Sequence, residues 1–573
     1  MAAIRDVTPL VRPAILPGTA NLAGRVVSAL VPSVLTACLL VAAVLPIGAL
    51  LARSLFDRAG SFVGIRNFVR YSTEPGLSIA AWNSVALSTM ATVIVVFIAF
   101  PVAYALARSR IPQRGLLRVV VMLPLLTPSL LPAFGLVYLF GNQGLLKSWL
   151  FGAPLYGPVG IVMGSVFYAL PHAVLILSAG LAAGDARLYE AAQALKAGPW
   201  RTFRTVTLPS CRYALVSAAS VVFVLVFTDF GIPTVLGGST NVLATDIYKL
   251  VIGRFDFELG AVVGVLLLLP AVIAFGVDAL VRRTERMHIT GRSVPIEPRP
   301  SLRRDTLLLV FAIGIAGAIL GLIGTAIFGS LVRFWPYNLT LGLHNYARLL
   351  DDADDVRALI NSLVLAACVA TLGTVMVACT GWVIARRIGP KPVQQTLHAV
   401  AMVPVAVPGL VLGLGYVFFF NNPHNPLHGL QGTMALIVIC TVTHFYTVPH
   451  LMTVGGLSRL DREVDLAGQA LRSGPLGTAR RIHVSFLAPT LVDVAGYFFV
   501  NAMTTVSALI FLFTAKTRVA AIAVVNMVEG SRFGQAAALA VLIMVMSIAA
   551  TVVQIGVRAA ILRAQGWRRR GAA

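Results

Sequence analysis

Long apolar runs are the feature that most constrains this fold. Twelve stretches of about 20 or more mostly apolar residues recur along the 573-residue chain, and a helix needs about that length to cross a bilayer. They cover residues 29–52, 81–107, 117–141, 158–181, 213–232, 259–281, 306–332, 358–385, 396–420, 431–453, 489–513 and 535–562. The runs are continuous rather than alternating, which favours helices over the strands of a membrane barrel. The sequence therefore predicts an all-α polytopic membrane protein with about twelve transmembrane helices.

The composition explains why a net charge of +23 does not indicate a nucleic-acid-binding protein. Hydrophobic residues make up 58% of the chain and charged residues only 12%, and the mean hydropathy is +0.87. A soluble protein could not cover that much apolar surface with so few charges. We therefore expect a lipid bilayer, and no nucleic acid, around this chain.

The basic residues instead predict an orientation. Of the 45 Lys and Arg residues, 32 lie in or beside the two termini and the loops that follow even-numbered runs, and 13 lie in or beside the other loops. Cytoplasmic loops of membrane proteins carry the excess of Lys and Arg. Both termini are therefore expected in the cytoplasm, with Arg568, Arg569 and Arg570 as part of this topology signal.

The chain is also a tandem repeat. Four landmarks recur in the same order and at a nearly constant offset, a little less than half the length of the chain. The matched landmarks are Asn83-Ser84 with Asn361-Ser362, Pro124 and Pro128 with Pro404 and Pro408, Phe167-Tyr168-x-x-Pro171-His172 with Phe445-Tyr446-x-x-Pro449-His450, and Gln193-Ala194-Leu195-x-x-Gly198-Pro199 with Gln469-Ala470-Leu471-x-x-Gly474-Pro475. Each half holds six runs, so the halves share one orientation. They are expected to form a parallel pseudo-dimer about an axis along the membrane normal.

This repeat divides the chain into five parts. The expected parts are a cytoplasmic N-terminal segment (1–28), a first six-helix domain (29–281), a cytoplasmic linker (282–305), a second six-helix domain (306–562) and a basic cytoplasmic tail (563–573). The linker contains three prolines and seven arginines without an apolar period, which is typical of a loop.

The loop between the fourth and fifth runs of the first half carries the clearest motif. Residues 189–198 read YEAAQALKAG, and this alanine-rich stretch favours a helix. We expect the helix to begin near Glu190, where the helix dipole favours an acid, and to end at Gly198-Pro199. Its small side chains would allow another protein to approach the backbone closely.

This motif resembles the cytoplasmic coupling loop of binding-protein-dependent ABC importer permeases, in which EAA is followed by Gly and later by Leu-Pro, here Leu208-Pro209. The whole chain is similar to the fused, double-length form in the iron(III) and 2-aminoethylphosphonate branch, which implies a bacterial inner-membrane protein that works by alternating access. The resemblance implies that a helix containing Glu190, Ala191, Ala192 and Gly198 docks into a groove of an ATP-binding subunit.

The second copy of the motif departs from the first. It reads DLAGQALRSG over residues 465–474, so Leu466 aligns with Glu190 and the acid lies one position earlier. By the same resemblance its coupling residues are Asp465, Ala467, Gly468 and Gly474. Either Asp465 or Glu463 could replace the acidic contact, and the alternative for both copies is an ordinary amphipathic helix on the membrane surface.

Other sequence features limit the chemistry of the chain. The dipeptide Gly-Lys is absent, so the chain has no P-loop for ATP. We expect a transport subunit rather than an enzyme, with no cofactor, and the resemblance implies two separate ATP-binding subunits and a periplasmic binding protein as partners. The five cysteines show no metal-binding spacing, so no metal site is expected.

Charged or polar groups at membrane depth are candidates for a substrate pathway. Asp229, in the sequence TDFGIP, lies where the fifth run breaks; it is either a pathway carboxylate or a helix-terminating residue. His172 and His450 each follow a proline, and they either line the pathway or bond a freed carbonyl. Asp278 and Asp493 are expected to form structural pairs with Arg282 or Arg283 and with a linker or loop arginine.

The substrate is implied by resemblance alone. Residues 227–253, 260–275 and 504–527 are more similar to the permease for 2-aminoethylphosphonate than to the iron(III) permeases. An iron(III) importer permease is the alternative. An ion-coupled secondary transporter is a further alternative, although the chain has few of the buried charges that such coupling requires.

Overall fold

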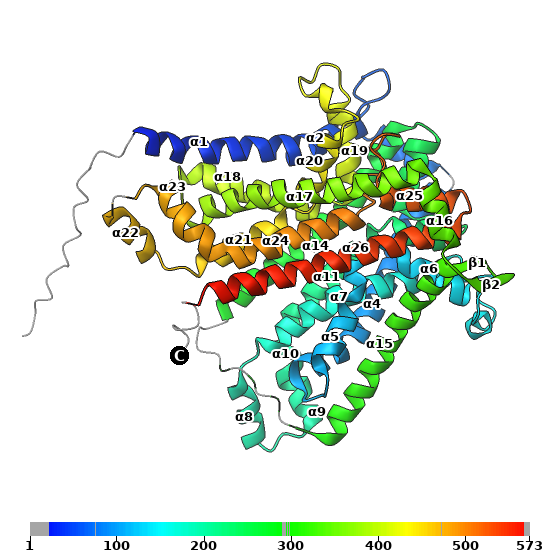
Figure 1. Ribbon diagram of the computed structural model, residues 1–573, viewed down its shortest axis with the longest axis horizontal. Helices are drawn as coiled ribbons and strands as arrows, with labels where there is room; N and C mark the ends of the chain where they lie inside the picture. The colour runs from blue at the N-terminus through cyan, green and yellow to red at the C-terminus, as the bar shows by residue number, and fades with distance from the viewer. Residues whose placement is uncertain are drawn as a thin grey trace, which may run out of the picture.

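A computed structural model (Figure 1) describes residues 22–74, 76–288, 300–471 and 473–566, together with residues 294, 296 and 298. The expected N-terminal segment up to residue 21, most of the linker between residues 289 and 299, and the tail from residue 567, including Arg568, Arg569 and Arg570, lie outside this described part.

The first half is a succession of helices. Its elements are α1 (Leu22–Leu39), η1 (Leu40–Val44), α2 (Leu45–Leu55), α3 (Arg66–Thr73), α4 (Leu77–Arg108), α5 (Arg114–Met122), η2 (Leu123–Leu126), α6 (Leu130–Phe140), η3 (Lys147–Leu150), α7 (Pro158–Ala182), α8 (Ala186–Ala194), α9 (Pro199–Thr202), η4 (Phe203–Thr207), α10 (Leu208–Ser210), α11 (Arg212–Phe227), α12 (Gly231–Leu236), α13 (Leu243–Tyr248), η5 (Lys249–Gly253) and α14 (Phe257–His288).

The second half repeats this plan and adds one short hairpin. Its elements are α15 (Leu302–Leu331), β1 (Val332–Phe334), β2 (Asn338–Leu341), α16 (His344–Asp351), α17 (Ala353–Ala385), α18 (Lys391–Met402), η6 (Val403–Ala406), α19 (Gly409–Phe420), η7 (His428–Leu430), α20 (Met434–His444), α21 (Thr447–Ser458), α22 (Glu463–Ala470), α23 (Pro475–Thr478), η8 (Ala479–His483), α24 (Val484–Thr504), α25 (Ala520–Glu529) and α26 (Phe533–Ala564).

The predicted all-α polytopic fold is confirmed. Within the described residues, eight helices are long and apolar enough to cross a membrane, and the number reaches twelve if each of four bent helix pairs counts as one span. Each of the twelve apolar runs coincides with one of these helices or pairs. In Figure 1, α1 begins and α26 ends at the end of the bundle that carries α8 and α22, opposite the β1–β2 hairpin. We name these ends the loop end and the hairpin end.

The third span of each half bends sharply. The bend is 101° between the α5–η2 segment and α6, and 115° between the α18–η6 segment and α19. Thr127 and Val407 are extended at these bends, and each precedes a proline, Pro128 or Pro408. A proline disfavours the helical conformation of the residue before it, so the repeated prolines fix the repeated bend.

Equivalent hydrogen bonds recur in the two halves. The Asn67 side-chain amide donates to the carbonyl oxygens of Ser54 and Phe56, and the Asn345 amide donates to those of Ser330 and Val332. The Ser84 hydroxyl accepts from the Leu243 N–H at 2.8 Å, and the Ser362 hydroxyl accepts from the Ala520 N–H at 2.7 Å. The repeat in the sequence is therefore a repeat in tertiary structure.

The first span of each half packs against the other half. The α2 helix packs on α19 of the second half, and α15 packs on α6 of the first half. Glycines make both crossings close: a Cβ added at Gly415 would lie 2.6 Å from the Pro46 carbonyl oxygen, and one at Gly135 would clash with the Leu322 carbonyl oxygen. These reciprocal contacts form the pseudo-dimer that the repeat predicts.

Candidate functional site

The first candidate coupling helix is α8. It begins at Ala186, because the Asp185 side chain caps it by accepting from the Arg187 N–H at 3.1 Å. The prediction that this helix begins near Glu190 is therefore wrong by about one turn, and Glu190 lies within α8. An Asp at the N-cap satisfies N–H groups that the helix itself leaves unpaired.

The outer face of the first loop combines small and apolar groups. Glu190 and Ala191 are exposed, whereas Ala192 is buried. Gly198 is exposed, and a Cβ added there would meet nothing within 4 Å. The large apolar side chains near it are also exposed: 81% of Leu195 and 73% of Trp200. Such an apolar patch is unusual for a surface without a partner.

The second loop presents the same face. Ala467 is exposed in α22, and a Cβ added at Gly474 would meet nothing within 4 Å. Leu471 is 82% exposed and Leu476 is 61% exposed, and these two residues align with Leu195 and Trp200 in the repeat. We call Leu195 with Trp200, and Leu471 with Leu476, the two loop faces. Figure 1 places α8 and α22, which directly precede the two loop faces in the sequence, at the loop end of the bundle.

Two residues of the second motif instead face the protein. Gly468 is buried, and a Cβ added there would lie 2.6 Å from the Thr478 hydroxyl oxygen. The Asp465 carboxylate lies 3.1 Å from Nη1 of Arg386 and 2.9 Å from Nε2 of His483. Asp465 aligns with Tyr189 when the two motifs are superposed, so its place in the first loop is taken by an aromatic side chain.

Asp229 lies where the fifth span of the first half is interrupted. The residue separates α11 from α12, and its carboxylate accepts from the Ile232 N–H at 2.9 Å and from the Ser129 hydroxyl. The carboxylate therefore closes the start of α12, and the side chain remains partly exposed.

The structure does not place His172 and His450 in one shared cluster of contacts. His172 lies beside Tyr168, with ring centroids 6.0 Å apart, and its Nδ1 has no hydrogen-bond partner among the described residues. His450 belongs to a buried chain in the second half, in which its Nδ1 lies 3.1 Å from the Thr380 hydroxyl and its Nε2 lies 3.2 Å from Nδ1 of His398. Tyr168 thus lies beside His172, whereas His450 has its own polar partners.

Two other aspartates form hydrogen bonds at equivalent places in the two halves, but the aspartate lies on the sixth span in the first half and on the fifth span in the second. Asp278 in α14 accepts from the Ser217 hydroxyl in α11, and Asp493 in α24 accepts from the Gln554 amide in α26 at 3.2 Å. Ser217 aligns with Asp493, and Asp278 aligns with Gln554, at the same offset that relates the two loop motifs.

The charged partner of Asp493 differs from the expectation. Asp493 also lies 3.5 Å from Nε of Arg558 in the last span, so its arginine comes from a helix rather than from a loop or linker. The side chains of Arg282 and Arg283, the expected partners of Asp278, lie outside the described part.

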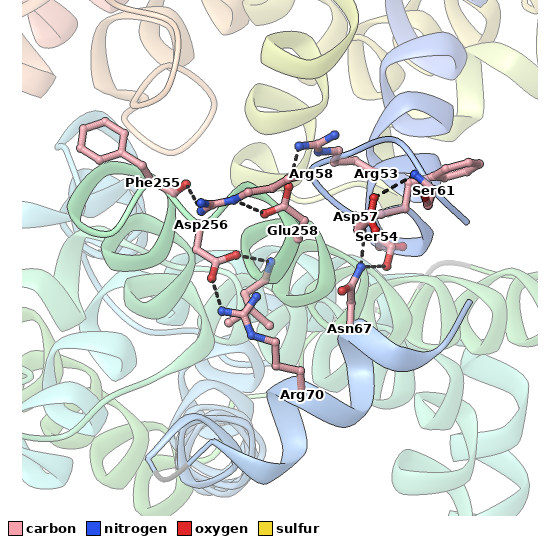
Figure 2. A network of polar contacts seen from close by, with 12 residues as sticks. Arg53, Ser54, Asp57, Arg58, Ser61, Asn67, Arg70, Phe255, Asp256 and Glu258 are labelled. Carbon is pink, nitrogen blue, oxygen red and sulfur yellow. Dashed lines mark hydrogen bonds and ion pairs between the residues drawn. The ribbon is translucent and has the colours of Figure 1, made fainter. Parts of the chain in front are cut away.

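Two acids at the start of α14 are paired with arginines of the first half. Glu258 lies 2.5 Å from Arg53 and 3.4 Å from Arg58, and Asp256 lies 2.6 Å from Arg70. Figure 2 shows how these side chains face one another. These pairs fix the segment after the first span to the start of α14. Within the described residues, no group of three or more His, Cys, Asp and Glu side chains is arranged to hold a metal ion.

Sequence reasoning missed Arg108 and Arg386. Arg108 is the last residue of α4 and Arg386 directly follows α17, so both lie at the loop end, and both are buried against the neighbouring loop helix. Their separation along the chain equals that of the Asn-Ser and Pro-His landmarks. This shared offset is the signal that could have identified them.

The comparisons with known proteins agree with this architecture. A family model described as a binding-protein-dependent transport system inner membrane component matches residues 99–286. The ferric transport system permease protein FbpB of Actinobacillus pleuropneumoniae is 30% identical over 464 residues, covering 78% of this chain and 67% of that protein. The putative ferric transport system permease protein FbpB 1 of Haemophilus influenzae is 31% identical over 438 residues, covering 73% and 68%.

A relative that is named for a different substrate matches at lower identity. The thiamine transport system permease protein ThiP of Brucella abortus is 27% identical over 415 residues, covering 70% of this chain and 72% of that protein. The chain therefore belongs to the family of binding-protein-dependent transport system inner membrane components, and it is a permease subunit of a binding-protein-dependent ABC importer.

Proposed function

We propose that this chain supplies both permease domains of an ATP-driven importer in a bacterial inner membrane. Its two permease domains (29–281 and 306–562) would be served by two ATP-binding subunits and a periplasmic binding protein. The observation that carries this proposal is the pair of exposed loop faces, which occupy matching positions in the repeat and lie at one end of the bundle. The same end holds the start of α1 and the end of α26, so both termini are cytoplasmic in this proposal.

The loop faces suit the docking of an ATP-binding subunit. Apolar side chains that are more than 60% exposed gain free energy when a partner covers them. Gly198 and Gly474 leave open space beside them, which allows a partner backbone to approach. Glu190 is exposed and unshielded, so it is placed to meet a basic side chain of the first subunit.

Movement of the loop helices would reach the spans directly. In the first half, the Tyr189 hydroxyl of α8 donates to the Thr207 hydroxyl at 3.0 Å, and Thr207 ends the η4 segment that leads into the fifth span. Closure of the ATP-binding subunits would therefore displace the fifth spans together with the loops. The interruption at Asp229 lies at the far end of the same span, where a substrate pathway between the halves would pass.

The substrate is the finer part of the proposal. Two relatives are named as ferric transport permeases, which supports iron(III) as the first substrate to test. The resemblance of residues 227–253, 260–275 and 504–527 to the 2-aminoethylphosphonate permease makes that compound the second. The Asp229 carboxylate could attract either a metal cation or a substrate ammonium group.

Uptake in cells tests this function and its alternatives. Cells that lack the chain, with or without a plasmid copy, are given radiolabelled ferric iron or radiolabelled 2-aminoethylphosphonate. We expect the plasmid copy to restore uptake of one compound, and we expect ATP depletion to abolish that uptake while an uncoupler that spares ATP does not. The reverse sensitivity would indicate an ion-coupled secondary transporter.

A further inference from the structure

A buried arginine marks the loop end of the second span in each half. Arg108 donates from Nε to the Leu181 carbonyl oxygen at 2.7 Å, and Arg386 donates from Nη1 to the Leu460 carbonyl oxygen at 3.1 Å. Both side chains are about 5% exposed. Each guanidinium thus binds backbone carbonyls at or just beyond the end of the fourth span, where helical carbonyls lack intrahelical partners.

In the first half, this arginine meets an uncharged partner on the loop helix. The Arg108 guanidinium carbon lies 4.8 Å from the centroid of the Tyr189 ring, within the range of a cation–π contact. The Tyr189 hydroxyl continues the chain of contacts to Thr207 at 3.0 Å. The contacts tie α8 to α4 on one side and to η4 on the other.

In the second half, the equivalent arginine meets a carboxylate. Nη1 of Arg386 lies 3.1 Å from one Asp465 oxygen, and Nε2 of His483 lies 2.9 Å from the other. The indole N–H of Trp382 donates to Nδ1 of His483 at 3.2 Å. Because an indole can only donate, Nδ1 accepts, and the proton of a neutral imidazole lies on Nε2, toward Asp465.

The two clusters occupy matching positions in the repeat. Arg108 aligns with Arg386 at the offset of the Asn-Ser landmark, and Tyr189 aligns with Asp465 and Thr207 with His483 at the offset of the loop motif. The arginine is the same in both halves, whereas both of the other positions in the cluster hold different residues in the two halves. In the second half, Asp465 beside His483 takes the place of Tyr189 beside Thr207. The contact between the arginine and the loop helix is therefore an ion pair in the second half and a cation–π contact in the first.

We propose that Asp465 is a positioning residue, which holds α22 against the spans through Arg386 and His483, and that Tyr189 is its counterpart in α8. The Asp465 side chain is 27% exposed, but its two oxygens face Arg386 and His483 within the chain, so in this proposal it does not replace Glu190 as a contact to the ATP-binding subunit. The anchor lets a movement of α22 reach the second span through Arg386 and the fifth span through His483. The proposal rests on the proposed function only for its effect on transport.

Hydrogen–deuterium exchange of the purified chain tests the anchor without any partner. Asp465→Asn removes the charge that faces buried Arg386, and we expect amides in residues 464–471 to exchange faster by about tenfold or more, the factor given by about 1.4 kcal/mol. Asp465→Glu keeps the charge and should stay within about twofold of wild type, well below that factor. The amides of residues 187–194 in α8 serve as the internal control and should not change.

The repeat supplies a rescue variant. Asp465→Tyr with His483→Thr builds the first half's contacts around Arg386, and we expect it to restore slow exchange in α22, whereas Asp465→Tyr alone should not. In cells, uptake at equal membrane levels should fall for Asp465→Asn and recover for Asp465→Glu. An effect on uptake without a change in exchange would favour a direct ATPase contact and overturn the proposal.

Two other results would also contradict the anchor. Unchanged exchange in Asp465→Asn would show that α22 does not depend on this carboxylate. Faster exchange in α8 and α22 alike would show a general loss of stability instead of a local anchor. Because exchange is measured on the chain alone, neither result bears on whether ATP-binding subunits dock at the loop faces.

Discussion

Gly415 of α19 lies against Pro46 of the first span so closely that a Cβ on the glycine would stand 2.6 Å from the Pro46 carbonyl oxygen. The same relationship holds between Gly135 and Leu322 in the other direction. Each half therefore holds the first span of the other at a crossing that admits no side chain. The two permease domains depend on each other for a closely packed interior.

Enlarging one of these glycines should weaken the contact between the halves. We expect Gly415→Val to destabilise the protein by about 1–3 kcal/mol or more, because an overpacked site must move backbone atoms. Gly314→Val is the matched control, since a Cβ at Gly314 meets nothing within 4 Å. Thermal unfolding in detergent, followed by size-exclusion chromatography, measures both variants. Equal melting temperatures for the two variants would argue against the close crossing.

Changes on the first loop face should abolish transport without disturbing the fold. Gly198→Asp places a charge beside Leu195 and Trp200, and Glu190→Arg reverses a charge on the same exposed helix. Because both positions are exposed in the isolated chain, we expect normal membrane insertion and a loss of uptake of about tenfold or more, which corresponds to about 1.4 kcal/mol of docking free energy.

A glycine at the hairpin end provides the control for Gly198→Asp. Gly253 is also exposed, with nothing within 4 Å of an added Cβ, and Gly253→Asp should leave uptake near the wild-type rate. Normal uptake and normal ATPase association in Gly198→Asp would rule out the coupling role of this loop.

Asp229→Asn separates the two interpretations of that residue. The carboxamide oxygen can still accept from the Ile232 N–H, so we expect the start of α12 and the melting temperature to be retained. If the negative charge attracts substrate, uptake should fall by about tenfold, as expected for the loss of about 1.4 kcal/mol. Uptake at the wild-type rate would leave Asp229 as a helix-capping residue only.

The pH dependence of stability should report on Asp246 of α13. Burial raises the pKa of this carboxyl to about 6, although Lys249 and Arg254 lower it, and Tyr71 lies beside it. As the pH rises from the ordinary value of 3.8, the unfolded state ionises first. Stability should therefore fall between about pH 4 and pH 6, and the loss of about 3 kcal/mol should be complete above that range.

Asp246→Asn removes this ionisation and tests the sign of the effect. We expect the variant to unfold at a higher temperature than wild type at pH 7.5, and the two proteins to converge near pH 4, where the wild-type carboxyl is protonated when folded. Thermal unfolding at both pH values measures the difference. A wild-type stability that does not change from pH 4.5 to pH 7.5 would contradict the expectation.

Much of the architecture could be predicted from the sequence because the bilayer imposes it. Apolar runs of sufficient length located every span, and the nearly constant offset between matched landmarks located the repeat. The bends of 101° and 115° were not predicted, although Pro128 and Pro408 were recognised as landmarks. A proline shows where helical geometry is interrupted, but the direction after the break depends on tertiary packing.

The loop site was only partly predictable for a similar reason. The motif located α8 and α22, yet Asp185 rather than Glu190 sets the helix start, and Asp465 turns toward the spans. Of the two partners of Asp465, Arg386 follows the second span of the second half, and His483 ends the η8 segment before the fifth span. Only the folded chain brings these three side chains together, so a local pattern could not indicate which face Asp465 occupies.

Site-specific photocross-linking in living cells tests most directly whether both loop faces dock ATP-binding subunits. A photoreactive amino acid is placed at Leu195, at Leu471, or at Phe334 near the hairpin end as a control, since all three side chains are more than 60% exposed. We predict that an ATP-binding cassette subunit, identified by mass spectrometry, is cross-linked from Leu195 and from Leu471 but not from Phe334. If no such subunit is captured from Leu195 or from Leu471, or if it is captured from Phe334 alone, the loop faces are not the docking sites.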